Sequence, residues 1–171
     1  TQAAFSFSGT HYTLKDLEAR PQPVQSPGPP LIMGGSAGPR SLALAARYAD
    51  EYNTPFATPQ DVRTRRDAML RACEAAGRDP LPFSVMTGFV VGADEPELRD
   101  RASRLAERIG SSAAAFLSDP PEAWIVGTLD RAAEQLGALR DAGVQRVMCQ
   151  NLLHDDLDVL ALIETLAPQV T

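Results

Sequence analysis

The chain has 171 residues, about the size of one ordinary domain, and 44% of them are hydrophobic while 22% are charged. Its net charge is −6 and its pI is about 4.9; no basic stripe stands out, which argues against a nucleic-acid-binding surface. No apolar run reaches the roughly 18 residues that suggest a membrane span. No basic segment followed by an apolar one opens the chain, so no secretory signal is expected. These features predict a cytoplasmic protein with neither a nucleic-acid nor a membrane partner.

Few residues are of the kinds that bind metals or form disulfides. Cys73 and Cys149 lie far apart with no CxxC spacing, so two reduced, buried thiols are expected. His11 and His154 have no partner at metal-ligand spacing, so the sequence predicts no metal site.

Residues 1–30 are predicted to be an irregular lead-in. The segment 21–30, PQPVQSPGPP, is too rich in proline for a helix or a central strand and should run extended over a surface. Residues 12–20 are compatible with a short helix or a turn. The opening TQAAFSFSGT has no initiator Met, which is typical of the middle of a longer chain.

From residue 31 the pattern becomes regular. Residues 31–33 are wholly apolar, which predicts a short strand buried on both faces. A glycine-rich turn follows, and Pro39 suits the first position of a helix over 41–48. Residues 49–53 are predicted to be a second short strand.

The rest of the chain alternates in the same way. Thr58 is a predicted N-cap for a helix that closes at Gly77, and 83–91 form a strand before a helix over 94–109. Residues 111–124 have no firm assignment. A helix follows Gly127-Thr128, and 144–150 form a strand before a helix over 156–167. The order predicts an α/β fold with a parallel sheet, and residues 31–171 contain four recognisable strand–helix units.

The turn at 34–38, GGSAG, is a candidate anion site. It lies between an apolar run and a helix start, where unpaired N–H groups and partial positive charge favour anions. Glycine permits close approach of a ligand, and Ser36 adds a hydroxyl donor. The motif is not the complete GxGxxG fingerprint and lacks the lysine of a P-loop. A phosphate-binding turn and a plain tight turn therefore both remain open.

Five segments carry a family resemblance. The chain resembles the luciferase-like monooxygenase superfamily, and most of all its branch of coenzyme F420-dependent oxidoreductases, in FSGTHYTL (7–14), PQPVQSPGPPLIMGGSAG (21–38), LAARYADEYN (44–53), CEAAGRDP (73–80) and VGTLDRAAEQLGALRDAGVQRVM (126–148). The resemblance implies a TIM-type (β/α)8 barrel, of which this chain supplies the C-terminal half, strands five to eight. The N-terminal half is absent, which implies a fragment, a half that pairs with another half, or a homo-oligomer.

The resemblance also implies a cofactor and its site. The cofactor phosphate would contact backbone N–H groups of the turn after the fifth strand, at Gly34, Gly35, Ser36 and Ala37. Asp50 and Asn53, at the end of the sixth strand, would face the barrel mouth and bind or orient the ligand; local turn bonding is the alternative. On position, Gln150, Asn151, His11, Trp124 and Phe116 are further candidates for the mouth or pocket, with surface or core packing as the alternative.

The implied reaction is hydride transfer between coenzyme F420 and a small organic substrate. An FMN-dependent monooxygenase of the same superfamily is the alternative, as is a non-catalytic half-barrel that works only after assembly. The sequence contains no Ser/His/Asp set and no paired carboxylates, so no catalytic residue is nominated. The isolated chain is expected to be inactive.

Overall fold

The computed structural model describes residues 4–170, with side chains as far as Pro168. The chain divides into two units, residues 1–31 and 32–171, and each is described by itself. The division lies one residue from the predicted end of the lead-in.

The first unit contains an antiparallel hairpin. Strand β1 (Phe5–Ser8) pairs with β2 (Thr13–Leu17), and the N–H of Gly9 donates to the carbonyl of Tyr12 at 2.8 Å to close the loop. The predictions of an irregular lead-in, and of a helix or turn over 12–20, are therefore wrong. Strand β1 alternates apolar and polar residues over only four positions, and β2, TLKDL, does not alternate, so neither strand stands out from the sequence. The proline-rich segment 21–30 forms neither helix nor strand, as predicted.

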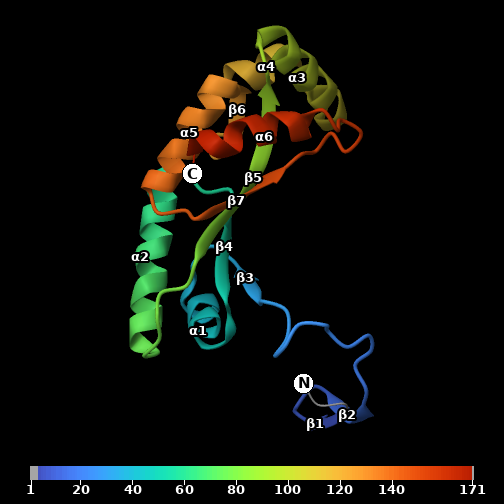
Figure 1. The fold of residues 1–171 in the computed structure, drawn as a ribbon, viewed down its shortest axis with the longest axis vertical. Helices are drawn as coiled ribbons and strands as arrows, with labels where there is room; N and C mark the ends of the chain where they lie inside the picture. Colours follow the sequence, from blue (N-terminus) through green and yellow to red (C-terminus); the bar gives the residue numbers. More distant parts are fainter. Residues whose placement is uncertain (1–3, 171) are drawn as a thin grey trace. The chain divides into compact units, whose positions relative to one another are not determined.

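The second unit is a parallel sheet whose strands are each followed by a helix (Figure 1). The strands are β3 (Ile32–Gly34), β4 (Glu51–Pro55), β5 (Phe83–Gly92), β6 (Ile125–Thr128) and β7 (Arg146–Gln150). Strand β5 has different neighbours along its length: β4 and β7 pair with its first half and β6 with its second. The described chain thus has five strand–helix units, not four. The missed strand, β6, has only four residues, and its Gly127-Thr128 resembles a helix start.

The helices largely follow their predicted caps. They are α1 (Pro39–Tyr48), α2 (Pro59–Ala75), α3 (Glu95–Ile109), α4 (Ala113–Ser118), α5 (Leu129–Asp141) and α6 (Val159–Val170). Pro39 opens α1, as predicted, and Thr58 caps α2 through a capping box with Asp61. Helix α4 lies in the segment that had no assignment. None of the helices in 4–170 has the length and apolar character needed to cross a membrane.

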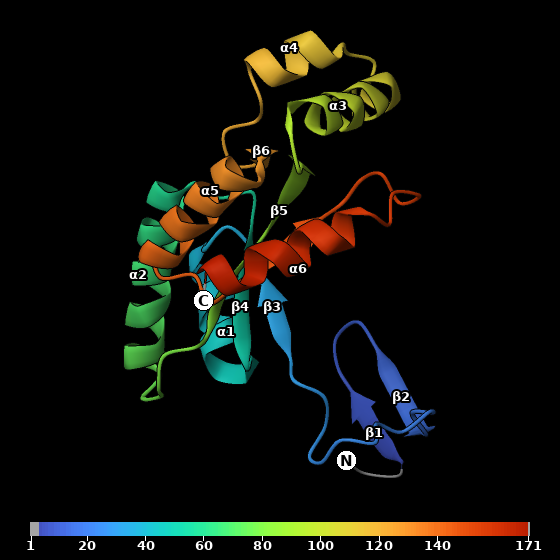
Figure 2. The same ribbon diagram turned by 45° about the horizontal axis from the view of Figure 1, so that its top comes forward.

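The register divides the sheet into two faces, because side chains alternate along each strand. On one side, termed the helix face, Tyr52, Phe83 and Val85 belong to a core with buried residues of α1, α2, α5 and α6. Figure 2 shows α2 and α5 side by side, as their contacts also indicate. On the other side, Val90 and Val126 pack in a second core with residues of α3 and α4. Strands β5 and β6 therefore lie between two layers of helices, with one core on each side.

The side of the sheet opposite the helix face is not covered by α3 and α4 over β3, β4, β7 and the first half of β5. We term this part the polar face; by register it contains Ile32, Glu51, Asn53, Ser84, Met86, Arg146, Met148 and Gln150. Five of these eight side chains are polar, which is unusual for a strand layer in the middle of an α/β domain.

Strand β3 is not buried on both faces, contrary to the sequence prediction. Ile32 is 41% exposed and the preceding Leu31 48%, while Met33 packs against the core. The reason is topological: among the described strands β3 pairs only with β4, so it lies at an edge of the sheet.

An ion-pair network joins α3 to the loop before α6. Arg101 Nε lies 2.9 Å from Asp156 Oδ2, and both side chains are buried. Arg101 also donates to the Val91 carbonyl at 2.8 Å and pairs with Glu97, and Arg104 reaches Asp156 at 2.9 Å. The hydrogen bond from Arg101 is the main reason that the pKa of Asp156 lies below its ordinary value.

Replacing Asp156 by Asn should therefore destabilise the fold. The change removes the buried counter-charge of Arg101 and leaves it only the partly exposed Glu97, and we expect the free energy of unfolding to fall by about 3 kcal/mol at neutral pH. The carboxylate stabilises the fold above the pKa of an unfolded Asp, about 3.9, and this contribution is lost as pH falls through the lower folded pKa. Urea unfolding at several pH values measures both effects.

The matched control is Asp155→Asn, because Asp155 pairs with Arg108 at the surface. It should change stability much less, since exposed ion pairs contribute little. Equal effects of the two substitutions would contradict the assignment of Asp156 as the structural carboxylate.

Candidate functional site

The buried Tyr52 side chain supports the turn between β3 and α1. Its hydroxyl accepts the N–H of Ala37 at 2.9 Å and lies 3.3 Å from the Ser41 hydroxyl. Ser41 Oγ in turn donates to the Gly38 carbonyl at 2.9 Å. Because Ser41 Oγ is already a donor there, its oxygen is available to accept from Tyr52. One tyrosine of the core thereby fixes the turn and the first residues of α1.

Glycine at position 35 is required by this arrangement. A Cβ there would lie 3.0 Å from Tyr52 Oη and 3.4 Å from Ser41 Oγ, tighter than ordinary packing. Ala37 has φ of 60°, a left-handed conformation that a non-glycine residue seldom adopts. The hydrogen bond from Ala37 to Tyr52 holds it there.

The hydrogen bonds show which N–H groups of the turn are free for a ligand. The N–H of Gly35 donates to the Asn53 carbonyl at 3.0 Å and that of Ala37 to Tyr52, so neither points to an anion. Gly34 is the last residue of β3 and pairs with Asn53 in the ladder. Of the three turn residues that follow β3, Gly35, Ser36 and Ala37, Ser36 keeps an N–H with no acceptor among residues 4–170.

Helix α1 adds donors that the sequence analysis missed. Its N-cap, Gly38, has no side chain to cap the first turn. Within the described part of the chain, the backbone N–H groups of Arg40 and Ser41 have no acceptor. The missed signal was the position of Arg40 directly after Pro39, which puts a cationic side chain at the start of the helix. The donor set is therefore Ser36, Arg40 and Ser41.

Asp50 and Asn53 do not lie together at this site. Strand β4 begins at Glu51, which is level with Ile32, the first residue of β3. Asp50 therefore lies before the amino end of β4, whereas the turn follows the carboxyl end of β3. The expectation that it faces the mouth is wrong, because the strand begins two residues later than predicted. Asn53 is level with Gly34, and its Nδ2 donates to Ser84 Oγ at 2.9 Å and contacts Met148 Sδ at 3.6 Å. Asn53 thus bonds to side chains of neighbouring strands on the polar face, and not within its own turn.

Glu51 and Arg146 form an ion pair on the polar face. Glu51 Oε2 lies 3.4 Å from Arg146 Nη2, with the Glu51 side chain 7% exposed and that of Arg146 61%. Glu51 Oε1 is buried and has no hydrogen-bond partner among residues 4–170, which is rare for a carboxylate. The sequence analysis missed this pair because the two residues are far apart in the chain.

Three aromatic side chains gather beyond the carboxyl end of β4, beside Gly88 in the middle of β5. Phe56 follows β4, Trp124 precedes β6, and Phe116 lies in α4. The Trp124 ring centroid is 6.4 Å from that of Phe56, with the rings stacked, and 6.0 Å from that of Phe116, edge to face. Trp124 and Phe116 pack in the second core, which is the packing alternative of the sequence analysis; their place at a ligand pocket stays a prediction.

Gln150 and Asn151, the other candidates of the second unit, do not join the turn. His11 is exposed in the loop of the hairpin unit, and Gln150 is exposed at the end of β7. The Asn151 side chain bonds to the backbone of Leu153 and Asp156 and so shapes its own loop. Within 4–170, no cluster of His, Cys, Asp or Glu is arranged to hold a metal ion.

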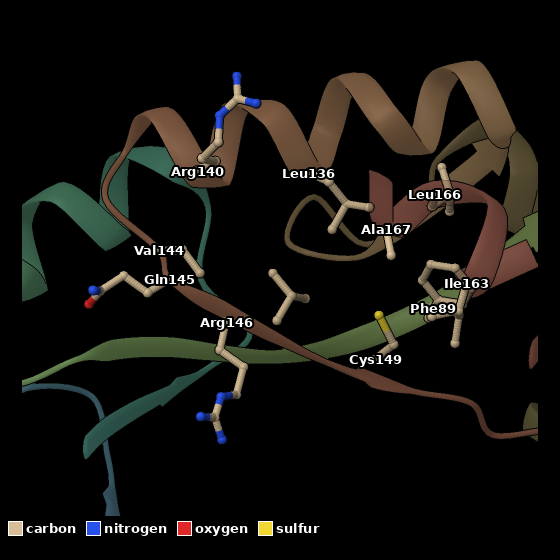
Figure 3. A pocket seen from close by; sticks show the side chains of 11 residues that line it. Phe89, Leu136, Arg140, Val144, Gln145, Arg146, Cys149, Ile163, Leu166 and Ala167 are labelled. Atoms are coloured by element: carbon tan, nitrogen blue, oxygen red, sulfur yellow. The ribbon is translucent and has the colours of Figure 1, made fainter. Parts of the chain in front are cut away.

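The two cysteines are free thiols, and Cys73 is buried. Cys149 is half-buried, and burial raises its pKa to about 11, so it remains protonated at neutral pH. It lines a pocket of about 480 Å³ between β7, α5 and α6 (Figure 3). Figure 3 shows the guanidinium groups of Arg140 and Arg146 directed away from the apolar centre. The pocket lies on the helix face, and it contributes nothing to the turn.

Comparison with known proteins agrees with this architecture. A family model described as "Luciferase-like monooxygenase" matches residues 1–146. A protein named FMNH(2)-dependent dimethylsulfone monooxygenase, from Pseudomonas putida, is 32% identical over 97 residues, which are 57% of this chain and 26% of that protein.

Solved structures of two cofactor types resemble the chain. An F420-dependent secondary alcohol dehydrogenase in complex with an F420-acetone adduct has a TM-score of 0.71 at 17% identity, over 100% of this chain and 57% of that one. The oxygenating constituent of 3,6-diketocamphane monooxygenase from Pseudomonas putida, in complex with FMN, has a TM-score of 0.66 at 17% identity, over 98% of this chain and 58% of that one. At these identities the likeness is one of fold, and the chain spans less than two thirds of each relative.

Tyr52→Phe should loosen the turn. The change removes the acceptor of the Ala37 N–H, and we expect the free energy of unfolding to fall by about 1 kcal/mol and the exchange of the Ala37 amide hydrogen to accelerate. Urea unfolding and amide exchange by NMR measure the two effects. Tyr48→Phe, at the exposed end of α1, is the control and should change neither. Unaltered exchange at Ala37 in Tyr52→Phe would show that the hydroxyl does not hold the turn.

Proposed function

The chain belongs to the luciferase-like monooxygenase family, and from that premise we propose that it is part of an oxidoreductase in which reduced FMN and O2 together oxygenate a small organic substrate, with one oxygen atom passing to the substrate and the other to water. The family match extends over residues 1–146, and a 32% identical relative is named as FMNH(2)-dependent. The observation that carries the proposal is the group of unbonded donors where α1 begins.

These donors fit a phosphate group. The N–H groups of Ser36, Arg40 and Ser41 lie at the positive end of α1, where an anion is stabilised. The Ser36 hydroxyl and the Arg40 guanidinium can add charge-assisted hydrogen bonds. The turn follows the carboxyl end of a parallel strand, the end where ligands bind in α/β folds.

The residues of this chain supply binding and position for the reaction. Bound FMN would supply the redox chemistry. Ser36 and the first turn of α1 would hold the phosphate, and Tyr52 and Gly35 would keep the turn in the shape that presents these donors. No described residue is placed as a general acid or base near the turn.

A second candidate is the deazaflavin coenzyme F420 with hydride transfer. Residues 21–38 and 44–53 resemble the F420-dependent branch, and the dehydrogenase with an F420-acetone adduct shares the fold. The same turn would serve this cofactor through its phosphate.

The phosphate assignment predicts that FMN binds more tightly than riboflavin, which lacks the phosphate. Arg40→Gln should weaken FMN binding about tenfold, a loss typical of one charge-assisted contact, and leave riboflavin binding unchanged. Quenching of flavin fluorescence measures both affinities.

Arg47→Gln, in the last turn of the same helix, is the matched control and should have no effect. Equal affinities for FMN and riboflavin would rule out the phosphate site. Tighter binding of F420 than of FMN, with the same dependence on Arg40, would favour the second candidate.

We also propose that the sheet is completed by further strands, from a second half or from another copy of the chain. Strands β3 and β7 each have one partner among the described strands, and unpaired edges of this kind favour pairing with another chain. The polar face has a buried carboxylate oxygen, Glu51 Oε1, that lacks a donor within 4–170. Until it is completed, the chain would be a non-catalytic half.

Sedimentation of the purified chain tests this assembly. We expect a species heavier than the 18.3 kDa monomer, because the edges and the polar face need a cover. Ile32→Lys, at the β3 edge, should shift the population toward monomer, whereas Leu44→Lys, equally exposed on α1, should not. A folded wild-type monomer at all concentrations would contradict the assembly.

A further inference from the structure

We propose that Phe56 and Trp124 form a binding surface, termed here the aromatic shelf, for the flat face of an aromatic ring in a small molecule. The two rings lie 6.4 Å apart between centroids and 22° from parallel. They meet beyond the carboxyl end of β4, the end of a parallel strand where ligands bind, with Trp124 against Gly88 in the middle of the longer β5. The inference does not depend on a phosphate at the turn after β3.

Phe56 combines an uncommon backbone conformation with a partly exposed aromatic ring. Its φ is 43°, in the left-handed region that large side chains avoid. Its side chain is 43% exposed, although a phenylalanine ring is normally buried. The N–H of Phe56 donates to the Met86 carbonyl at 2.8 Å, which holds the residue in place. An unfavourable backbone that displays an apolar ring is a typical feature of ligand sites.

Trp124 is held rigidly behind Phe56. The backbone N–H of Trp124 donates to the Pro121 carbonyl at 2.8 Å, and the backbone carbonyl of Trp124 accepts from Gln135 Nε2 at 3.3 Å. Thr87 Oγ1 donates to the carbonyl of Ala123, the preceding residue.

The indole ring itself is confined on two sides. It lies against Gly88, where a Cβ would overlap its six-membered ring. Phe116 meets it edge-on at 6.0 Å. The shelf is therefore preorganised, and a ligand that stacks on it need not order these side chains.

The chemistry of the shelf favours a planar ring. Aromatic rings stack with offset faces, and stacking on an exposed aromatic side chain accepts many ring types. Neighbouring strands lie about 4.8 Å apart, so a ligand held at the turn after β3 can extend to the shelf after β4. The ring could therefore belong to an aromatic substrate or to the cofactor, and the experiment below separates these sources.

The test uses the full chain and the indole N–H signal of Trp124 in NMR, since the chain has a single tryptophan. The probes are 2-naphthol and decahydro-2-naphthol, which share a carbon skeleton and a hydroxyl but differ in planarity. We expect 2-naphthol to shift the Trp124 signal and to bind at least tenfold more tightly than the saturated alcohol. Phe56→Leu, which keeps an apolar side chain without a ring face, should weaken 2-naphthol about tenfold.

The control is Tyr48→Leu, which removes an exposed aromatic ring from α1 and should leave both affinities unchanged. If Phe56→Leu fails to fold, the changes that 2-naphthol causes in the backbone amide shifts of the wild-type chain still test the proposal. The strongest shifts should fall on Phe56, Gly88 and Trp124. The proposal is overturned if they fall on Cys149 and Ile163 of the apolar pocket, or if the two alcohols bind equally.

Competition with FMN then identifies the source of the ring. Displacement of 2-naphthol by FMN would assign the shelf to the cofactor ring, and simultaneous binding would assign it to the substrate. Failure of the phosphate proposal is seen separately, as equal binding of FMN and riboflavin, and does not affect the naphthol result.

Discussion

The burial of β5 on both faces is the constraint on which the rest of the structure depends. Phe83, Val85 and Val91 point into the core formed by α1, α2, α5 and α6, while Val90 points into the core of α3 and α4. A strand with two apolar faces needs a helix layer on each. Because α3 and α4 cover only the second half of the strand, the first half keeps the polar face, and Gly88 marks the transition with the indole of Trp124 against it.

The candidate anion site is a consequence of the same core. Tyr52 packs beside Phe83 with ring centroids 5.8 Å apart, and its hydroxyl ends beneath the turn. A buried tyrosine hydroxyl needs a partner, and the Ala37 N–H satisfies it. The donors left for a ligand are those beyond the reach of Tyr52, at Ser36 and the first residues of α1. Core packing has thus selected which N–H groups of the turn remain free.

The fold alone does not decide between the two cofactors. Structures with F420 and with FMN resemble this chain to similar extents at 17% identity, and a helix start that binds one phosphate accepts another. The named relative at 32% identity gives FMN the better support. Selectivity between the cofactors depends on the side chains that contact the ring, rather than on the turn.

The sequence by itself determined four of the five strand–helix units from residue 31 onward, the caps at Pro39 and Thr58, and the glycine turn, because these depend on short-range periodicity and local hydrogen bonds. It did not determine the hairpin or β6, whose strands are too short for a clear pattern. Only the tertiary structure decided that the N–H of Gly35 donates to the Asn53 carbonyl and that of Ala37 to the Tyr52 hydroxyl. It alone placed Phe56 on Trp124, because the register of parallel strands joins residues that are far apart in the chain.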